Sequence, residues 1–267
     1  MCSKSGALSA VCASRHAKDR KGNAMHTSLP SAFPGFAGNS SNEIVKSGKN
    51  GNIFVLILDE SGSMSGVTND TIGGVNSLIE SQKKDPIKTR MKIVKFEGGN
   101  ISTIRDGFVD NHHNLTSKDY HPKGGTNLLD AVGQTLLDVN IELSALDESE
   151  RPSVIFQITT DGEENQSTRF DLQKVKNLIS KATDAGWMFT FIGANIDAFR
   201  AATSMGINVA GVSSYNVNNT VGTFRAMNSS VTRMKSAMNL GATSSQIYAS
   251  GSTYTEEERK EMTGGKK

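Results

Sequence analysis

Five oxygen-bearing side chains are spaced along the chain so that they could bind a divalent cation. Asp59, Ser61 and Ser63 alternate in a tight Asp-Glu-Ser-Gly-Ser loop, whose glycine permits backbone angles that let the three oxygens converge. Thr126 follows a Gly-Gly pair, and Asp161 follows a Thr-Thr pair. Hard cations such as Mg²⁺ prefer oxygen ligands, and Mn²⁺ can replace Mg²⁺ at such sites. The sequence therefore predicts one metal site made of these five residues.

Each motif also has a simpler interpretation when it is taken alone. The Asp-Glu-Ser-Gly-Ser loop could be a turn whose Asp and Ser cap the helix that follows. The hydroxyl of Thr126 could likewise cap the helix that begins after it. The metal hypothesis depends on elements that bring the separate motifs together.

Two strands are predicted directly before the two aspartates. Residues 53–58 form a continuous apolar run that ends at Asp59, and residues 154–158 form a second run that leads through Thr-Thr to Asp161. An apolar run without alternation is typical of a strand that is buried on both faces, as in a parallel sheet. In such sheets the functional crevice lies beyond the carboxyl ends of the strands. Both aspartates are therefore expected at that crevice.

The remaining pattern predicts an α/β fold. Helices are expected around Ile72 to Ile79 and over 127–146, 172–182, 198–205 and 221–239, and further strands over 91–96, 101–104, 187–192 and 208–212. A Gly-Gly-Asn turn at 98–100 predicts a hairpin, so one edge strand is antiparallel. The expected class is a Rossmann-like, doubly wound, mostly parallel sheet with one antiparallel edge strand and helices on both faces.

The combination Asp-x-Ser-x-Ser, Gly-Gly-Thr and Thr-Asp-Gly resembles the metal-ion-dependent adhesion site of the von Willebrand factor type A family. The resemblance covers roughly residues 51–215, and residues 191–195 and 205–207 are also similar to bacterial and phage-encoded members. It implies that Ser61 and Ser63 ligate the cation directly and that Thr126 does so in some conformational states. It implies that Asp59 and Asp161 act mainly through bound waters. It also implies that the helix from Val221 can move when the metal contact changes.

A site of this composition favours binding over catalysis. Neutral hydroxyls leave the cation strongly electrophilic with a coordination position open, which an acidic side chain of a partner protein can fill. Neither a general base nor a nucleophile is evident, so the chain is predicted not to be an enzyme. One alternative is a metal-dependent phosphatase-like enzyme of phosphoryl transfer, but Ser61 stands where such an enzyme needs its second carboxylate. Another is an adaptor or structural component for an ATPase or a phage assembly, since the chain itself has no P-loop.

Composition divides the 267 residues into three expected parts. Residues 1–50 hold seven basic and two acidic residues and both cysteines, and they are predicted to be a disordered arm or linker of unknown role. Residues 51–240 are predicted to form the domain, and 241–267 a polar tail that is frayed from Ser250. Residues 51–267 hold 22 basic and 25 acidic residues, which disfavours nucleic-acid binding by the domain. The sequence shows no membrane span, and a cytoplasmic location is expected.

Three histidines, His112, His113 and His121, invite comparison with a zinc site. They lie in a polar stretch without a cysteine or a helical histidine spacing, so they are interpreted as surface-loop residues. The Met-rich stripe of the last helix is interpreted as core contact. Neither the partner nor the oligomeric state can be predicted.

Overall fold

The computed structural model of the chain describes residues 51–194 and 196–265. The predicted arm, residues 1–50, lies outside the described residues. The described part contains a sheet of the strands β1 (Asn52–Asp59), β2 (Thr89–Glu97), β3 (Asn100–Phe108), β4 (Ser153–Thr160), β5 (Met188–Gly193) and β6 (Val212–Ser214). Its α-helices are α2 (Thr68–Lys84), α3 (Leu128–Ser144), α4 (Leu172–Asp184), α5 (Ile196–Ser204), α6 (Thr220–Asn239), α7 (Ser244–Ala249) and α8 (Glu256–Met262). Short 3₁₀ helices include η2 (Gly62–Val67) and η5 (Val209–Gly211).

The strand order β3-β2-β1-β4-β5-β6 confirms the predicted fold class. The β2–β3 hairpin is the antiparallel pair, and the other neighbours are parallel. After β1 the chain first builds the sheet on one side through β2 and β3, and then returns to add β4 on the other side of β1. The order therefore reverses between β1 and β4, and a crevice is expected at their carboxyl ends.

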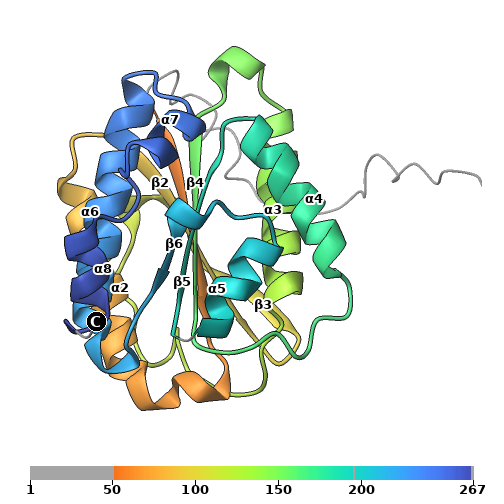
Figure 1. Cartoon of the computed structure of the whole chain (residues 1–267), viewed down its shortest axis with the longest axis vertical. Helices are drawn as coiled ribbons and strands as arrows, with labels where there is room; N and C mark the ends of the chain where they lie inside the picture. The colour runs from red at the N-terminus through yellow and green to blue at the C-terminus, as the bar shows by residue number, and fades with distance from the viewer. Residues whose placement is uncertain (1–50, 195, 266–267) are drawn as a thin grey trace, which may run out of the picture. The chain divides into compact units, whose positions relative to one another are not determined.

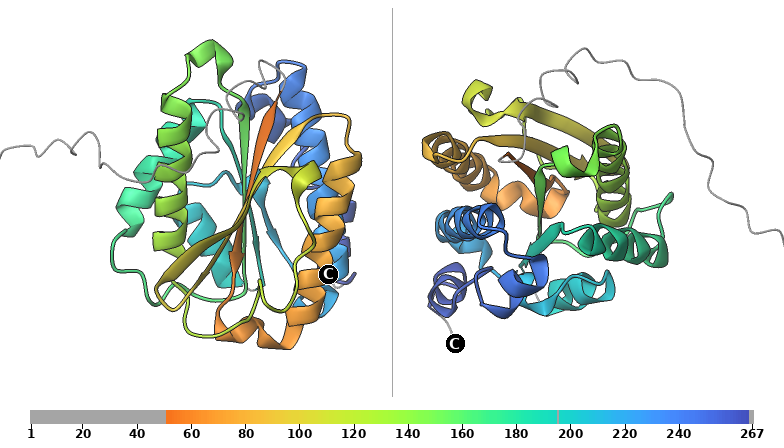
Figure 2. Two further views of the ribbon diagram at one scale, coloured as in Figure 1. Left: turned by 180° about the vertical axis from the view of Figure 1, so that it is seen from behind. Right: turned by 90° about the horizontal axis from the view of Figure 1, so that it is seen from above.

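The sequence of β1 explains its central place. All eight of its residues are buried, because it pairs with β2 along one side and β4 along the other and is covered on both faces. The side chains alternate between two cores, with Phe54, Leu56 and Leu58 in one and Ile53, Val55 and Ile57 in the other. The first core is covered by α2, α6, α7 and α8, and the second by α3, α4 and α5. Figure 1 shows α2, α6 and α8 on one side of the sheet and α3, α4 and α5 on the other, and the view from above in Figure 2 shows the same layers.

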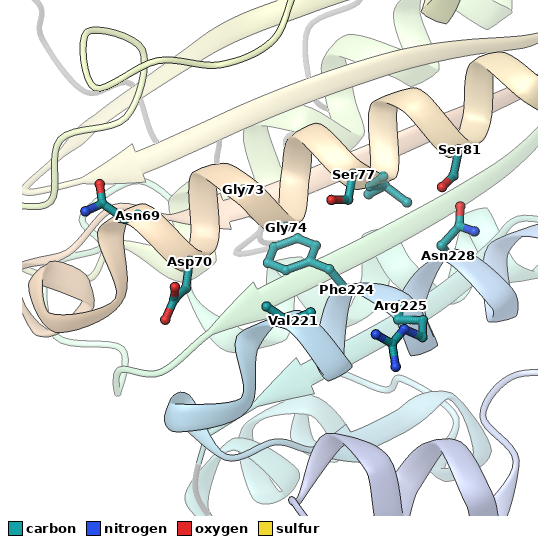
Figure 3. A pocket seen from close by; sticks show the side chains of 11 residues that line it. Asn69, Asp70, Gly73, Gly74, Ser77, Ser81, Val221, Phe224, Arg225 and Asn228 are labelled. Atoms are coloured by element: carbon teal, nitrogen blue, oxygen red, sulfur yellow. The ribbon is translucent and has the colours of Figure 1, made fainter.

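Helices α2 and α6 pack closely because α2 has a glycine, Gly74, where the Phe224 ring of α6 contacts it. An ideal Cβ built on Gly74 of α2 would lie 2.1 Å from Cδ2 of Phe224 in α6. Figure 3 shows the Phe224 ring against this part of α2, beside a cavity of about 310 Å³ between the two helices. Gly73, the preceding residue, is exposed and has nothing within 4 Å of an ideal Cβ.

The segment after α6 is not the frayed polar tail that the sequence predicts. Helices α7 and α8 bring Ile247, Tyr248 and Met262, together with Tyr254 between the helices, into the first core. The Tyr248 hydroxyl donates to the carbonyl oxygen of Phe189 at 2.8 Å. These few apolar side chains are separated by polar ones, so the segment has a polar average although it contributes to the core.

The last strand is shorter and later than predicted. Residues 209–211 form the turn η5, because the side chain of Asn208 accepts a hydrogen bond from the backbone N–H of Ala210 at 2.9 Å. Strand β6 then covers only Val212–Ser214. The guanidinium of Arg259 in α8 donates to the carbonyl oxygens of Ala210 and Val212, so α8 satisfies acceptors at this sheet edge. None of the helices in the described residues is long and apolar enough to cross a membrane.

Candidate metal centre

Asp59 is the last residue of β1 and is completely buried. Its Oδ1 accepts a hydrogen bond from the backbone N–H of Ser61 at 2.7 Å, and its Oδ2 accepts one from the hydroxyl of Thr160 at the end of β4. The Tyr120 hydroxyl donates to the carbonyl oxygen of Asp59 at 2.7 Å. Both carboxylate oxygens are thus held in place at the carboxyl ends of the two central strands.

The two serines of the loop connect Asp59 to Asp161. The hydroxyl oxygens of Ser61 and Ser63 are 3.0 Å apart, and the Ser63 hydroxyl donates to Oδ1 of Asp161 at 2.7 Å. Ser61 is buried, whereas Ser63 is exposed at the start of η2. The loop after β1 and the loop after β4 therefore meet through these side chains, although Ser63 and Asp161 are 98 residues apart in the chain.

Thr126 reaches the same place from a third loop. An ideal Cβ built on Gly162 would lie 2.7 Å from Oγ1 of Thr126 and 3.6 Å from Oδ2 of Asp59. The Thr126 hydroxyl and the Asp59 carboxylate thus both lie against Gly162, where a larger residue would intrude. Thr126 is buried and comes just before Asn127, the residue that precedes α3, and neither its hydroxyl nor the Asn127 side chain caps that helix.

Backbone hydrogen bonds fasten the three loops together. The N–H of Gly62 donates to the carbonyl oxygen of Gly124 at 3.1 Å, and the N–H of Gly98 donates to that of Gly125 at 2.8 Å. Gly124 has a φ of 66°, a left-handed conformation that favours glycine. On the other side, the Asn165 side chain accepts from the N–H of Thr126 at 3.0 Å. The Gly-Gly-Thr segment therefore lies between the loop after β1 and the loop after β4 and is hydrogen-bonded to both.

The centre concentrates negative charge without a cationic side chain. In the described residues, neither Asp59 nor Asp161 forms an ion pair with a Lys, Arg or His side chain. Burial raises the pKa of Asp59 although hydrogen bonds from Thr160 and Ser61 act against the rise. Burial also raises the pKa of Asp161 against the hydrogen bond from Ser63. A divalent cation would supply the counter-charge that the protein side chains do not provide.

Two residues that position the site, Thr160 and Tyr120, are not among those that the sequence motifs predict. The Thr160 hydroxyl donates to Oδ2 of Asp59. The position of Thr160 directly before Asp161, at the end of a buried strand, is the sequence signal that could have indicated this role. Tyr120 is fully buried, and burial together with the nearby charge of Asp59 raises the pKa of its hydroxyl, which therefore stays a donor. Nothing in the polar stretch around Tyr120 distinguished it in the sequence.

Other polar residues near these loops have structural roles. The carboxylate of Glu164 accepts from the N–H groups of Leu129 and Ser167, so it holds the start of α3 against the loop after β4. His112 is buried, which corrects its interpretation as a surface residue, whereas His113 and His121 are exposed. Within the described residues no three His, Cys, Asp or Glu side chains are grouped to hold a metal, so a cation at this centre depends on the hydroxyls.

Comparison with known proteins supports the fold. No family model matches the chain, and no curated protein matches it. The solved structure of proximal thread matrix protein 1 from the mussel byssus (crystal form 2) is 12% identical with a TM-score of 0.50 and covers 68% of this chain. The pilus adhesin SpaC from Lactobacillus rhamnosus GG, in its open conformation, is 11% identical with a TM-score of 0.51 and covers 71% of this chain. A von Willebrand factor type A structure from Catenulispora acidiphila is 15% identical with a TM-score of 0.47 and covers 69%.

The similarity is to part of each of these proteins. The chain spans 48% of the mussel protein, 31% of the pilus adhesin and 43% of the Catenulispora protein. Together with the six-stranded sheet order, the matches to the mussel protein and the pilus adhesin show that the chain has a von Willebrand factor type A-like fold, as its motifs predict. At these identities the likeness concerns the fold, and the function has to be argued from the site.

Proposed function

We propose that this chain is a protein-binding module that depends on a divalent cation. Asp59, Ser61, Ser63, Thr126 and Asp161 hold the cation at the carboxyl ends of β1 and β4. The cation in turn captures an acidic side chain of a partner protein. The observation that carries the proposal is the pair of uncompensated aspartates beside three converging hydroxyls.

The donor chemistry favours Mg²⁺, with Mn²⁺ as a substitute. The candidate ligands are oxygen atoms, which hard cations prefer, and there is no sulfur or imidazole ligand among them. Three of the five ligands are neutral, so a bound cation keeps much of its charge. When bound, the cation supplies an electrophilic centre with a position open to an external carboxylate.

The geometry supports binding rather than catalysis. Both oxygens of Asp59 accept hydrogen bonds within the protein, from Ser61 and Thr160, so this carboxylate is fixed as a support and is poorly placed to attack a substrate. Ser61 cannot act as the second carboxylate that a phosphatase-like mechanism needs. The acidic balance of residues 51–267 supports a protein partner over a nucleic acid.

Calorimetric titration of Mg²⁺ and Mn²⁺ into the chelator-treated full chain tests the metal site. Saturable binding at one site is expected, and it should be lost in a Ser61→Ala/Ser63→Ala variant. The matched control is Ser65→Ala, because the Ser65 hydroxyl donates to the carbonyl oxygen of Gly62 at 2.7 Å in the same loop and is not a proposed ligand. Absence of binding by the native chain, or equal loss in the control, would overturn the proposal.

The partner chemistry needs a second measurement. A labelled Gly/Ser peptide with one central glutamate should bind in Mg²⁺, and binding should disappear with chelator or when the glutamate is replaced by glutamine. Circular dichroism of each variant establishes that it is folded before its binding is compared. Peptide binding that survives chelation would show that the cation is not the point of capture.

A further inference from the structure

A second polar cavity lies directly beside the candidate metal centre. It measures about 220 Å³, and its charged lining consists of Glu60, Lys95, Glu97, Lys118, His121 and Lys123. We call it the lysine pocket. The residues of its wall come from the metal loop, from the β2–β3 hairpin and from the segment before the Gly-Gly-Thr motif.

The lysine pocket shares its wall with the metal loop. Glu60 stands between the proposed metal residues Asp59 and Ser61. Its backbone N–H donates to the carbonyl oxygen of Phe96 at 2.9 Å, and its own carbonyl oxygen accepts from the N–H of Lys123 at 2.9 Å. A ligand that reaches the metal from the β2 side therefore passes close to this pocket.

The Glu60 carboxylate is neutralised within the protein, whereas Glu97 has one uncharged hydrogen-bond partner and one loose ion pair. Oε1 of Glu60 accepts from the ammonium of Lys95 at 2.9 Å and from the backbone N–H of His121, and its side chain is only 3% exposed. Oε1 of Glu97 accepts from the amide of Asn100 at 2.9 Å. The Lys95 ammonium offsets the charge of Glu60, and the lining holds three lysines against two carboxylates, so the balance of charge in the pocket favours an incoming anion.

The two remaining lysines are available to a ligand. Within the described residues, the Lys118 ammonium takes part in no ion pair and no side-chain hydrogen bond, and Lys118 is exposed. The Lys123 ammonium is 3.6 Å from Oε1 of Glu97, and its side chain is 62% exposed. A loose and exposed ion pair of this kind contributes little, so Lys123 can turn to an external carboxylate at small cost.

We propose that the lysine pocket binds a second carboxylate of the same partner segment, so that the module recognises a pair of acidic residues rather than one. This inference rests on the proposed function, which supplies the first carboxylate at the metal. The pocket adds selectivity, because a segment with one acid gains only the metal contact. Since the attraction is between exposed charges, it should weaken as the ionic strength rises.

Fluorescence anisotropy with labelled Gly/Ser peptides, measured on the full chain in Mg²⁺, tests the inference. One peptide carries a single glutamate, and the others carry two glutamates separated by zero to four residues. At least one two-acid peptide should bind about fivefold more tightly than the single-acid peptide, which is the upper end for an added contact between exposed charges. The advantage should disappear in a Lys118→Gln/Lys123→Gln variant.

The matched control is Lys174→Gln/Lys176→Gln, which removes the same charge from the exposed surface of α4. This control should keep the advantage of the two-acid peptide, and both variants should keep native affinity for Mg²⁺ and for the single-acid peptide. An equal affinity for one-acid and two-acid peptides, or an advantage that survives in Lys118→Gln/Lys123→Gln, would overturn the inference alone. Failure of Mg²⁺ to bind the native chain would instead overturn the proposed function.

Discussion

Replacing Gly73 or Gly74, two adjacent glycines in α2, by alanine should change the free energy of unfolding in opposite directions. Gly73 is exposed and an added Cβ would meet nothing within 4 Å, whereas at Gly74 it would lie 2.1 to 2.7 Å from three carbon atoms of the Phe224 ring. Both residues are inside a 17-residue helix, so replacement by alanine brings the same gain in helix propensity, about 1 kcal/mol. The difference between the two variants therefore isolates the cost of packing.

Gly73→Ala should raise the free energy of unfolding by up to about 1 kcal/mol. Gly74→Ala should lower it by about 2 kcal/mol, because an overpacking cost of about 3 kcal/mol, at the upper end of the usual range, exceeds the propensity gain. The upper end applies because three ring atoms are inside contact distance and the ring is buried between two helices (Figure 3). For a domain of this size the corresponding shifts in Tm are about 2 to 4 °C per kcal/mol.

Urea unfolding followed by circular dichroism measures both variants. A double-mutant cycle with Phe224→Ala sharpens the test, since removing the ring should turn the loss from Gly74→Ala into a gain. Equal stability of Gly73→Ala and Gly74→Ala, or a loss from Gly74→Ala that persists without the Phe224 ring, would refute the account of how α2 and α6 pack.

Three further predictions concern other parts of the domain. Gly162→Ala should lower Mg²⁺ affinity in calorimetry by about tenfold or more without unfolding the chain, because the new Cβ would lie 2.7 Å from Oγ1 of Thr126. Lys235→Met should cost about 3 to 5 kcal/mol in denaturant unfolding, because it removes a completely buried ammonium that pairs with Oδ2 of Asp85 at 2.9 Å, and a loss below about 1 kcal/mol would contradict this. Burial alone would raise the pKa of the Asp130 carboxyl, but hydrogen bonds from three backbone N–H groups outweigh burial and lower this pKa below its ordinary value of 3.8. Its stabilising effect is therefore present above that value and is lost as the pH falls through the folded-state pKa, so unfolding of Asp130→Asn should depend less on pH in acid than unfolding of the native chain.

The central sheet was predictable because its sequence signals are local and strong. Continuous apolar runs mark β1 and β4, and the Gly-Gly-Asn turn marks the β2–β3 hairpin. Once these strands are parallel neighbours, Asp59 and Asp161 must lie at the same edge, so the proximity of the aspartate loops also follows from the sequence. The metal itself stays a prediction, because the contacts explain how the donors converge and not what they hold.

The C-terminal helices were missed although the sequence contains signals for them. Thr243 with Gln246 and Thr255 with Glu258 form capping boxes at the starts of α7 and α8. The Thr-x-x-Gln and Thr-x-x-Glu spacings indicate helix starts, but a capping box predicts a helix only when an apolar stripe follows. Helices of six and seven residues are too short to show such a stripe. Their stability comes from contacts with β5, β6 and α6, which the local sequence does not reveal.

The candidate site also depends on contacts between residues that are far apart in the sequence, which a short sequence motif does not reveal. Gly162 is part of the recognised Thr-Asp-Gly motif, yet the reason for a glycine there is the 2.7 Å approach of the Thr126 hydroxyl from another loop. The neutralisation of Glu60 by Lys95 likewise joins residues 35 positions apart. The first contact leaves room for the Thr126 hydroxyl at the site, and the second reduces the negative charge that a ligand meets beside it. Two chains with the same five metal residues could therefore differ in affinity for the cation and for acidic partners, and the difference would come from the residues around the ligands.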